Sequence, residues 1–128
     1  MQLIRRFLAL WAPAEGIQAM PDAEAPMLDR LVARWTREGV APHPPEDAAR
    51  VQQVFRTLGF EATPDVLALY GAIGGMNVPD DVFWRLWPLD EVVAQPPSAQ
   101  GVLFSDYLIS CWEYRLLPVS AAHSAIYV

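Results

Sequence analysis

The chain contains no lysine, only one cysteine and two histidines, and no long run of apolar residues. A single cysteine excludes an internal disulfide and is typical of a reducing compartment. No apolar run approaches the ~20 residues that span a bilayer, so no membrane segment is predicted. The apolar run at residues 7–12 is also too short for the core of a signal peptide. We therefore expect a cytoplasmic protein that does not associate with membranes.

The charge balance is acidic. Nine basic residues, all of them Arg, oppose 15 acidic residues and leave a formal net charge of −6. Nucleic-acid binding requires a basic surface that contacts phosphates, so this composition argues against a nucleic-acid partner. An acidic surface would instead attract a basic protein.

The length and composition predict one folded domain. The 128 residues are 53% hydrophobic and 19% charged, which is typical of a globular protein and allows one hydrophobic core. Twelve prolines and seven glycines are spread along the chain without a repeat. Three of the prolines lie in residues 39–45 and predict a stiff, extended linker there.

Apolar periodicity predicts helices first and strands afterwards. Helical spacing occurs over residues 2–11, 27–38, 46–58 and 64–73. The last of these has Thr63 as the expected N-cap, an apolar face formed by Val66, Leu69, Tyr70 and Ile73, and a glycine pair at 74–75 as the expected stop. Strands are predicted at 83–87, 102–105, 107–116 and 124–128, with a turn or short helix at 88–93. This order favours an α+β fold, with helices packed on one face of a mainly antiparallel sheet of four or more strands.

The segments after residue 45 resemble a known family. They read Leu-Gly at 58–59, Gly-Gly at 74–75, W-P-L-D-E-V at 87–92 and F-S-D-Y-L-I-S-C-W-E-Y-R-L at 104–116. This succession is similar to the SMI1/KNR4 family of the SUKH superfamily. The resemblance implies a single SUKH-like domain over residues 1–128, with 1–45 as an N-terminal helical extension and 46–128 as the family-like core. Members usually continue into a further helix, so the resemblance implies a short or truncated C-terminus and an open sheet surface that would permit a homodimer.

The resemblance also implies a function. Bacterial members resemble immunity proteins that bind and neutralise polymorphic toxins, whereas fungal relatives resemble cell-wall signalling scaffolds. The chain is therefore expected to be a protein-binding domain, either an immunity protein for a cognate toxin or a scaffold with another partner. A third hypothesis is a small-molecule site lined by the tryptophans.

The polar residues do not predict an enzyme. Cys111, His123 and Asp106 can be written as a triad, but any chain of this size offers such a trio. Cys111 is expected to be a small buried residue of a strand, and Asp106 a turn residue. The histidines have no metal-ligand spacing, and the glycines at 71, 74 and 75 lack the lysine and preceding strand of a phosphate loop. No catalytic residue, metal or cofactor is predicted.

Acidic and aromatic residues concentrate in the second half of the chain. Alternation in a strand over 83–87 places Phe83, Arg85 and Trp87 on one face and Trp84 and Leu86 on the other. Most aromatic side chains supply core area, but Trp84 or Trp87 would be suited to anchor a partner. Together with nearby carboxylates, they form the predicted partner-binding set: Asp80, Asp81, Trp84, Trp87, Asp90, Glu91 and Glu113.

Overall fold

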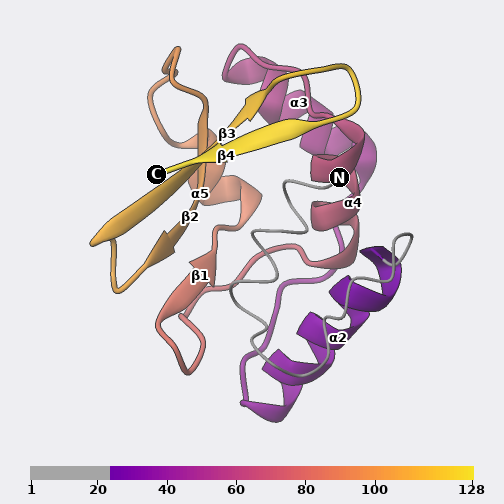
Figure 1. Ribbon diagram of the computed structural model, residues 1–128, viewed down its shortest axis with the longest axis vertical. Helices are drawn as coiled ribbons and strands as arrows, with labels where there is room; N and C mark the ends of the chain where they lie inside the picture. The colour runs from indigo at the N-terminus through magenta and orange to yellow at the C-terminus, as the bar shows by residue number, and fades with distance from the viewer. Residues whose placement is uncertain (1–23) are drawn as a thin grey trace.

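The computed structural model describes residues 24–128, which form four helices and one four-stranded sheet (Figure 1). The helices are α2 (Glu24–Arg37), α3 (Ala48–Thr57), α4 (Pro64–Ala72) and α5 (Leu89–Val93). The strands are β1 (Trp84–Leu86), β2 (Val102–Tyr107), β3 (Trp112–Pro118) and β4 (Ser124–Tyr127). Three helices precede the sheet and α5 connects β1 to β2, so the predicted α+β class is confirmed.

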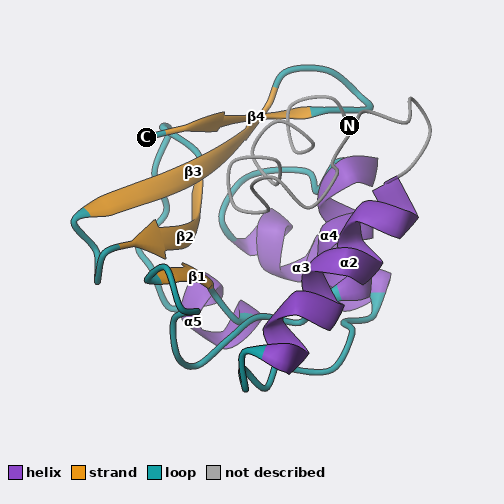
Figure 2. Ribbon diagram, turned by 60° about the horizontal axis from the view of Figure 1, so that its bottom comes forward, coloured by secondary structure: helices purple, strands orange, loops and turns teal. Residues whose placement is uncertain are grey.

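The strands follow one another in chain order across the sheet, and each is antiparallel to the next. Tyr107 of β2 pairs with Trp84 of β1 and with Trp112 of β3. Because directly paired residues point to the same face, these three aromatic residues share one side of the sheet. Figure 2 shows α2, α3 and α4 gathered on one side of this sheet.

The core joins α2 to the sheet. Trp35 of α2 stacks on Trp84 of β1, with ring centroids 5.4 Å apart, and both side chains are 0% exposed. Leu31, one helical turn before Trp35, is also buried. Such stacked aromatic pairs stabilise a core beyond the area that they bury. Helix α2 therefore shares one core with the segments after residue 45.

Helix α4 begins at Pro64 as predicted, and all four residues of its predicted apolar face are buried. Its two ends differ from the expectation. The Thr63 side chain does not cap the helix backbone, because its hydroxyl instead donates to the Asp65 carboxylate and lies 2.6 Å from the Ser124 hydroxyl. The helix ends at Ala72, before the glycine pair, so the glycines do not terminate it.

The glycine pair instead allows three backbone segments to approach closely. The His43 N–H donates to the Gly75 carbonyl at 2.8 Å, and the Gly74 N–H donates to the His43 carbonyl at 3.1 Å. A Cβ atom on Gly74 would lie 2.0 Å from the Pro44 carbonyl oxygen, and one on Gly75 would lie 2.5 Å from Pro88 Cα. The proline-containing segment at 39–45 is thus fastened to the chain that follows α4.

The segment predicted as one strand from 107 to 116 is interrupted by a turn. Tyr107 ends β2 and pairs with Trp112, the first residue of β3, which leaves residues 108–111 in the turn. Cys111 is consequently exposed in the turn and is not a buried strand residue. Asp106 lies inside β2 and is 4% exposed, so the turn position expected for it is wrong.

The remaining predictions concern the chain ends and the link after β1. The expected strand at 124–128 is present as β4, and the expected turn or short helix at 88–93 is α5. The helix predicted at 2–11 lies outside the described residues. Over residues 24–128, every helix is too short or too polar to cross a bilayer.

Candidate functional site

The seven residues predicted to bind a partner do not lie on one surface. Trp84 is 0% exposed and Asp80 is 4% exposed. Both are enclosed by the fold, which corrects the expectation that they contact a partner. Because Trp84 is stacked on Trp35, it does not line a surface pocket for a small molecule either.

Asp80 instead organises the loop that leads into β1. Its Oδ1 atom accepts the backbone N–H groups of Val82 and Trp84, both at 3.0 Å. Its Oδ2 atom accepts the indole N–H of Trp35, also at 3.0 Å. A buried carboxylate that accepts three hydrogen bonds is a structural group. Asp80 thereby connects α2, the loop and β1.

Asp90 and Glu91 occupy the first turn of α5, and each is paired with an arginine. Asp90 Oδ1 accepts a hydrogen bond from Arg50 at 2.6 Å. The guanidinium of Arg85 donates to both oxygens of Glu91, at 2.9 and 2.8 Å. Each arginine is shared with a second carboxylate, Arg50 with Glu46 and Arg85 with Asp106, so each of the two groups keeps a net negative charge.

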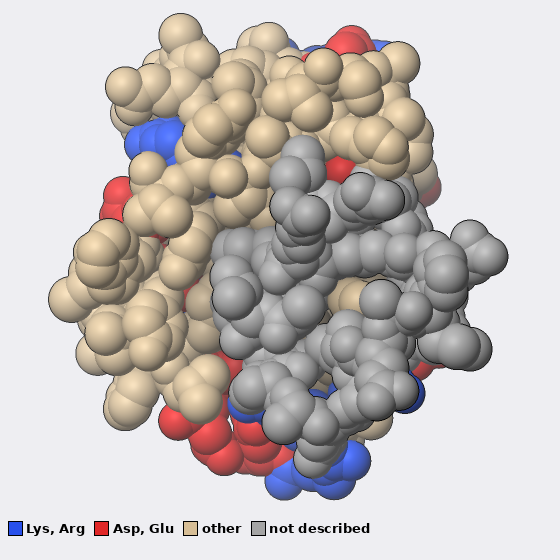
Figure 3. All heavy atoms as spheres, viewed as in Figure 1, with Lys and Arg blue, Asp and Glu red and all other residues tan. Residues whose placement is uncertain are grey.

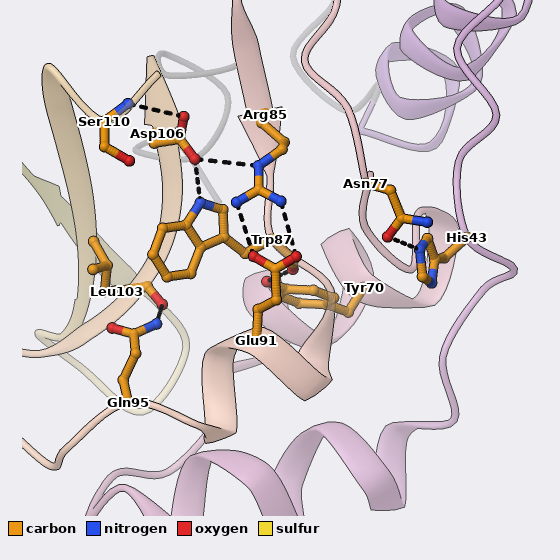
Figure 4. A network of polar contacts seen from close by, with 10 residues as sticks. All are labelled: His43, Tyr70, Asn77, Arg85, Trp87, Glu91, Gln95, Leu103, Asp106 and Ser110. Atoms are coloured by element: carbon orange, nitrogen blue, oxygen red, sulfur yellow. Dashed lines mark hydrogen bonds and ion pairs between the residues drawn. The ribbon is translucent and has the colours of Figure 1, made fainter. Parts of the chain in front are cut away.

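Asp106 is the centre of a polar network that joins β1, β2 and α5 (Figure 4). Its Oδ2 atom accepts Arg85 Nε at 3.3 Å and the indole N–H of Trp87, and its Oδ1 atom accepts the Ser110 backbone N–H at 3.4 Å. The Arg85 guanidinium also lies 5.4 Å from the Trp87 ring centroid. Burial by itself lowers the pKa of Arg85, but the hydrogen bond and charge of Glu91, together with Asp106, raise it overall. Trp87 is therefore a half-buried member of this network.

Tyr70 supports the same region from α4. Its hydroxyl donates to the Trp87 carbonyl at 2.9 Å. Burial raises the pKa of the Tyr70 phenol far above its ordinary value, and the charges of Glu46 and Glu91 raise it further. The phenol therefore stays neutral at physiological pH and serves as a hydrogen-bond donor.

Asp81 and Glu113 are the two predicted residues that remain exposed without a counter-charge. Both are exposed, and neither forms an ion pair with another residue of the described chain. Within the described residues, these two are therefore the carboxylates of the predicted set that are exposed and lack an ion pair.

Five exposed apolar side chains gather where β1 begins and where β2 turns into β3. Their exposed fractions range from 40% for Leu108 to 78% for Ile109. The two loops are joined, because the Leu108 N–H donates to the Phe83 carbonyl at 2.8 Å. We call this group the hairpin end, and its members are Val82, Phe83, Leu108, Ile109 and Trp112.

The hairpin end projects away from the helical layer. Figures 1 and 2 both show the β2–β3 turn at the edge of the molecule opposite α2 and α4. In Figure 3, uncharged atoms cover the left edge of the view, where this turn lies, and acidic atoms border them above and below. Exposed apolar side chains with a charged border are typical of an interaction site.

The backbone of the hairpin end is strained. Phe83, Leu108, Ile109 and Ser110 have positive φ angles of 65°, 52°, 53° and 64°. Residues other than glycine, asparagine and aspartate rarely adopt this left-handed region, and a β-branched residue such as Ile109 is an outlier there. Each such residue costs roughly 1–2 kcal/mol. Backbone strain therefore coincides with exposure at three members of the hairpin end, Phe83, Leu108 and Ile109.

Cysteine and histidine do not assemble a catalytic group. Cys111 and His123 flank opposite ends of β3, whose seven residues span roughly 23 Å at the usual rise. His123 Nδ1 lies 3.9 Å from Asp65 Oδ2. The buried Asp65 carboxylate accepts the N–H of Val66 at 2.8 Å and that of Ser124 at 3.0 Å, which fastens β4 to α4. Among residues 24–128, no cluster of three or more His, Cys, Asp or Glu residues could hold a metal ion.

Neither a protein-family model, nor a curated protein, nor a solved structure matches this chain. The resemblance to the SMI1/KNR4 family therefore stays a prediction.

Two members of the hairpin end, Phe83 and Trp112, were recognisable in the sequence as aromatic residues of its second half. Leu108 and Ile109 carried no such signal, because they read as alternating residues of a continuous strand.

Proposed function

We propose that this chain is a protein-binding domain without catalytic activity, and that it is an immunity protein which binds and neutralises a cognate bacterial toxin in the cytoplasm. The observation that carries the protein-binding part is the hairpin end, where strained backbone and exposed apolar side chains coincide. The neutralising role is supported by the resemblance of residues 46–128 to SMI1/KNR4 immunity proteins.

The proposed mechanism is occlusion of the toxin. A turn that projects from a sheet can enter a concave active site or substrate channel, and burial of its apolar side chains provides the binding energy. Phe83 and Trp112 are suited to anchor the complex, because aromatic residues dominate interface energetics. The net charge of −6 would accelerate encounter with a basic toxin domain.

Co-purification with the proteins encoded by the two flanking genes tests this proposal. Each is produced separately, mixed with this chain and separated by size-exclusion chromatography at low and high salt. We expect a stable complex with one of them, weaker at high salt because exposed charges are then screened. Expression of that protein alone should arrest growth, and co-expression of this chain should restore it.

Two results would change the proposal. If neither flanking protein forms a complex even at low salt, the immunity role is refuted and the alternative, an intracellular scaffold with another partner, replaces it. If a flanking protein binds but is harmless when expressed alone, the complex supports an intracellular scaffold of the SMI1/KNR4 type in place of an immunity protein.

A further inference from the structure

We propose that the hairpin end is the contact surface of the complex, and that it fits a partner surface with an apolar centre and a border of Lys or Arg side chains. This inference rests on the proposed protein-binding function and names both the surface and the chemistry of the partner. It places the contact on residues that are mostly different from the acidic and tryptophan set predicted from the sequence.

Backbone strain and solvent exposure coincide at the same residues of the hairpin end. Ile109 is 78% exposed with a φ of 53°, and Phe83 is 51% exposed with a φ of 65°. Packing within the chain does not offset the strain, because the greater part of Ile109 and about half of Phe83 face solvent. Backbone strain is typical of functional sites, where a bound partner supplies the missing contacts.

Negative charge lies beside the hairpin end. Asp81 immediately precedes its first loop residue, and Glu113 immediately follows its last residue. Both are exposed, and neither is ion-paired within the described chain. Arg85, the basic residue of β1, is already engaged by Glu91 and Asp106. The charges left for a partner at this end of the sheet are therefore negative.

This charge distinguishes between candidate partners. A second copy of the hairpin end would bring like carboxylates together, and the phosphates of nucleic acids or acidic lipids would also be repelled. A border of Lys or Arg would neutralise Asp81 and Glu113 while the apolar centre buries Phe83, Ile109 and Trp112. The partner is therefore a protein with a basic rim around an apolar depression.

The test measures the affinity of two asparagine variants for the flanking-gene protein that binds. Asparagine accepts a positive φ, so Phe83→Asn and Ile109→Asn remove the apolar side chains without disturbing the backbone. We expect each variant to weaken binding by about thirtyfold, the size of an interface hot spot. Val119→Asn is the matched control, because Val119 is 53% exposed but lies beyond the other end of β3. It should change the affinity by less than about twofold.

A second pair of variants tests the charged border. Asp81→Asn combined with Glu113→Gln should weaken binding at low salt and reduce its dependence on salt. Glu61→Gln is the control, since Glu61 is a 65% exposed carboxylate whose partner is Arg56. The control should leave the salt dependence of the wild type unchanged.

The outcomes separate this inference from the proposed function. A complex that tolerates Phe83→Asn and Ile109→Asn would overturn the hairpin end as the contact surface but would leave the protein-binding function intact. Failure of both flanking proteins to bind would refute the immunity role and, with it, a toxin as the partner of the hairpin end. Two further results would overturn the stated partner: self-association in sedimentation that Ile109→Asn abolishes, or binding to phosphatidylcholine vesicles that the same variant abolishes.

Discussion

Ile109→Asn is expected to increase the free energy of unfolding, although it removes a large apolar side chain. Ile109 has a φ of 53°, and a residue other than glycine, asparagine or aspartate costs roughly 1–2 kcal/mol in that region. The side chain is 78% exposed, so only about a fifth of the 1.5–3 kcal/mol for full burial of an isoleucine is lost, or roughly 0.5 kcal/mol. The net gain is about 1 kcal/mol, which corresponds to a rise in Tm of about 4 °C for a chain of this size.

Urea unfolding followed by tryptophan fluorescence measures this gain. Ile109→Thr is the control that separates backbone strain from hydrophobicity, because threonine is polar but keeps the β-branch. The threonine variant keeps the strain and should be no more stable than the wild type, whereas the asparagine variant should be more stable. If both variants are equally stable, or if Ile109→Asn lowers stability, the strain at the hairpin end is not real and its functional interpretation loses its basis.

Three further predictions concern the core. Asp80→Asn should destabilise the protein by about 2 kcal/mol in chemical denaturation, because it leaves the Trp35 indole N–H without its acceptor, and the loss should shrink in a Trp35→Phe background. Gly74→Ala should lower the free energy of unfolding by about 3 kcal/mol, because its Cβ would lie 2.0 Å from the Pro44 carbonyl oxygen. Gly71→Ala is the control and should raise it by about 0.5–1 kcal/mol, because Gly71 lies within α4 and a Cβ there meets open space. The contribution of Tyr70 to the free energy of unfolding should be constant below pH ~10 and fall above it by about 1.4 kcal/mol per pH unit, because the phenol loses its proton more easily in the unfolded chain. Urea titrations at several pH values should show that Tyr70→Phe removes this part of the pH dependence.

The helices and most strands were predictable because their signals are local. The apolar period of α4 and the proline at its start are read directly from neighbouring residues, and every residue of the predicted face is buried. The change from helical to alternating patterns after residue 80 likewise indicated an α+β order. These features depend on the periodic spacing of apolar residues, which can be read from a single sequence.

The β2–β3 turn was not predictable, because it lacks the residues that mark turns. Residues 108–111 read Leu-Ile-Ser-Cys, without the Gly, Pro, Asn or Asp that left-handed or tight turns usually contain. The aromatic and β-branched residues around them favour a continuous strand. Tertiary contacts override this preference, since Asp106 accepts the Ser110 N–H and Phe83 accepts the Leu108 N–H.

The burial of Asp80 and Asp106 could not be predicted from local patterns either, because it depends on residues far away in the sequence. Asp80 accepts a hydrogen bond from Trp35, which lies 45 positions earlier, and Asp106 is paired with Arg85, which lies 21 positions earlier. A carboxylate in a polar stretch is normally solvated, so the sequence alone favours a surface position. Local patterns likewise allowed Trp84 to be predicted as a partner-binding residue, although in the fold it is stacked on Trp35 and buried.

The native cysteine allows the central claim to be measured most directly. Cys111 is the sole cysteine, is exposed, and lies within the turn that carries Leu108 and Ile109. The measurement is the rate at which N-ethylmaleimide modifies Cys111, in the free chain and in the complex with the flanking-gene protein. If the hairpin end is the contact surface, the complex should react at least about tenfold more slowly than the free chain, because an interface core excludes solvent. Equal rates in the complex and the free chain would show that the partner binds elsewhere and would contradict the account.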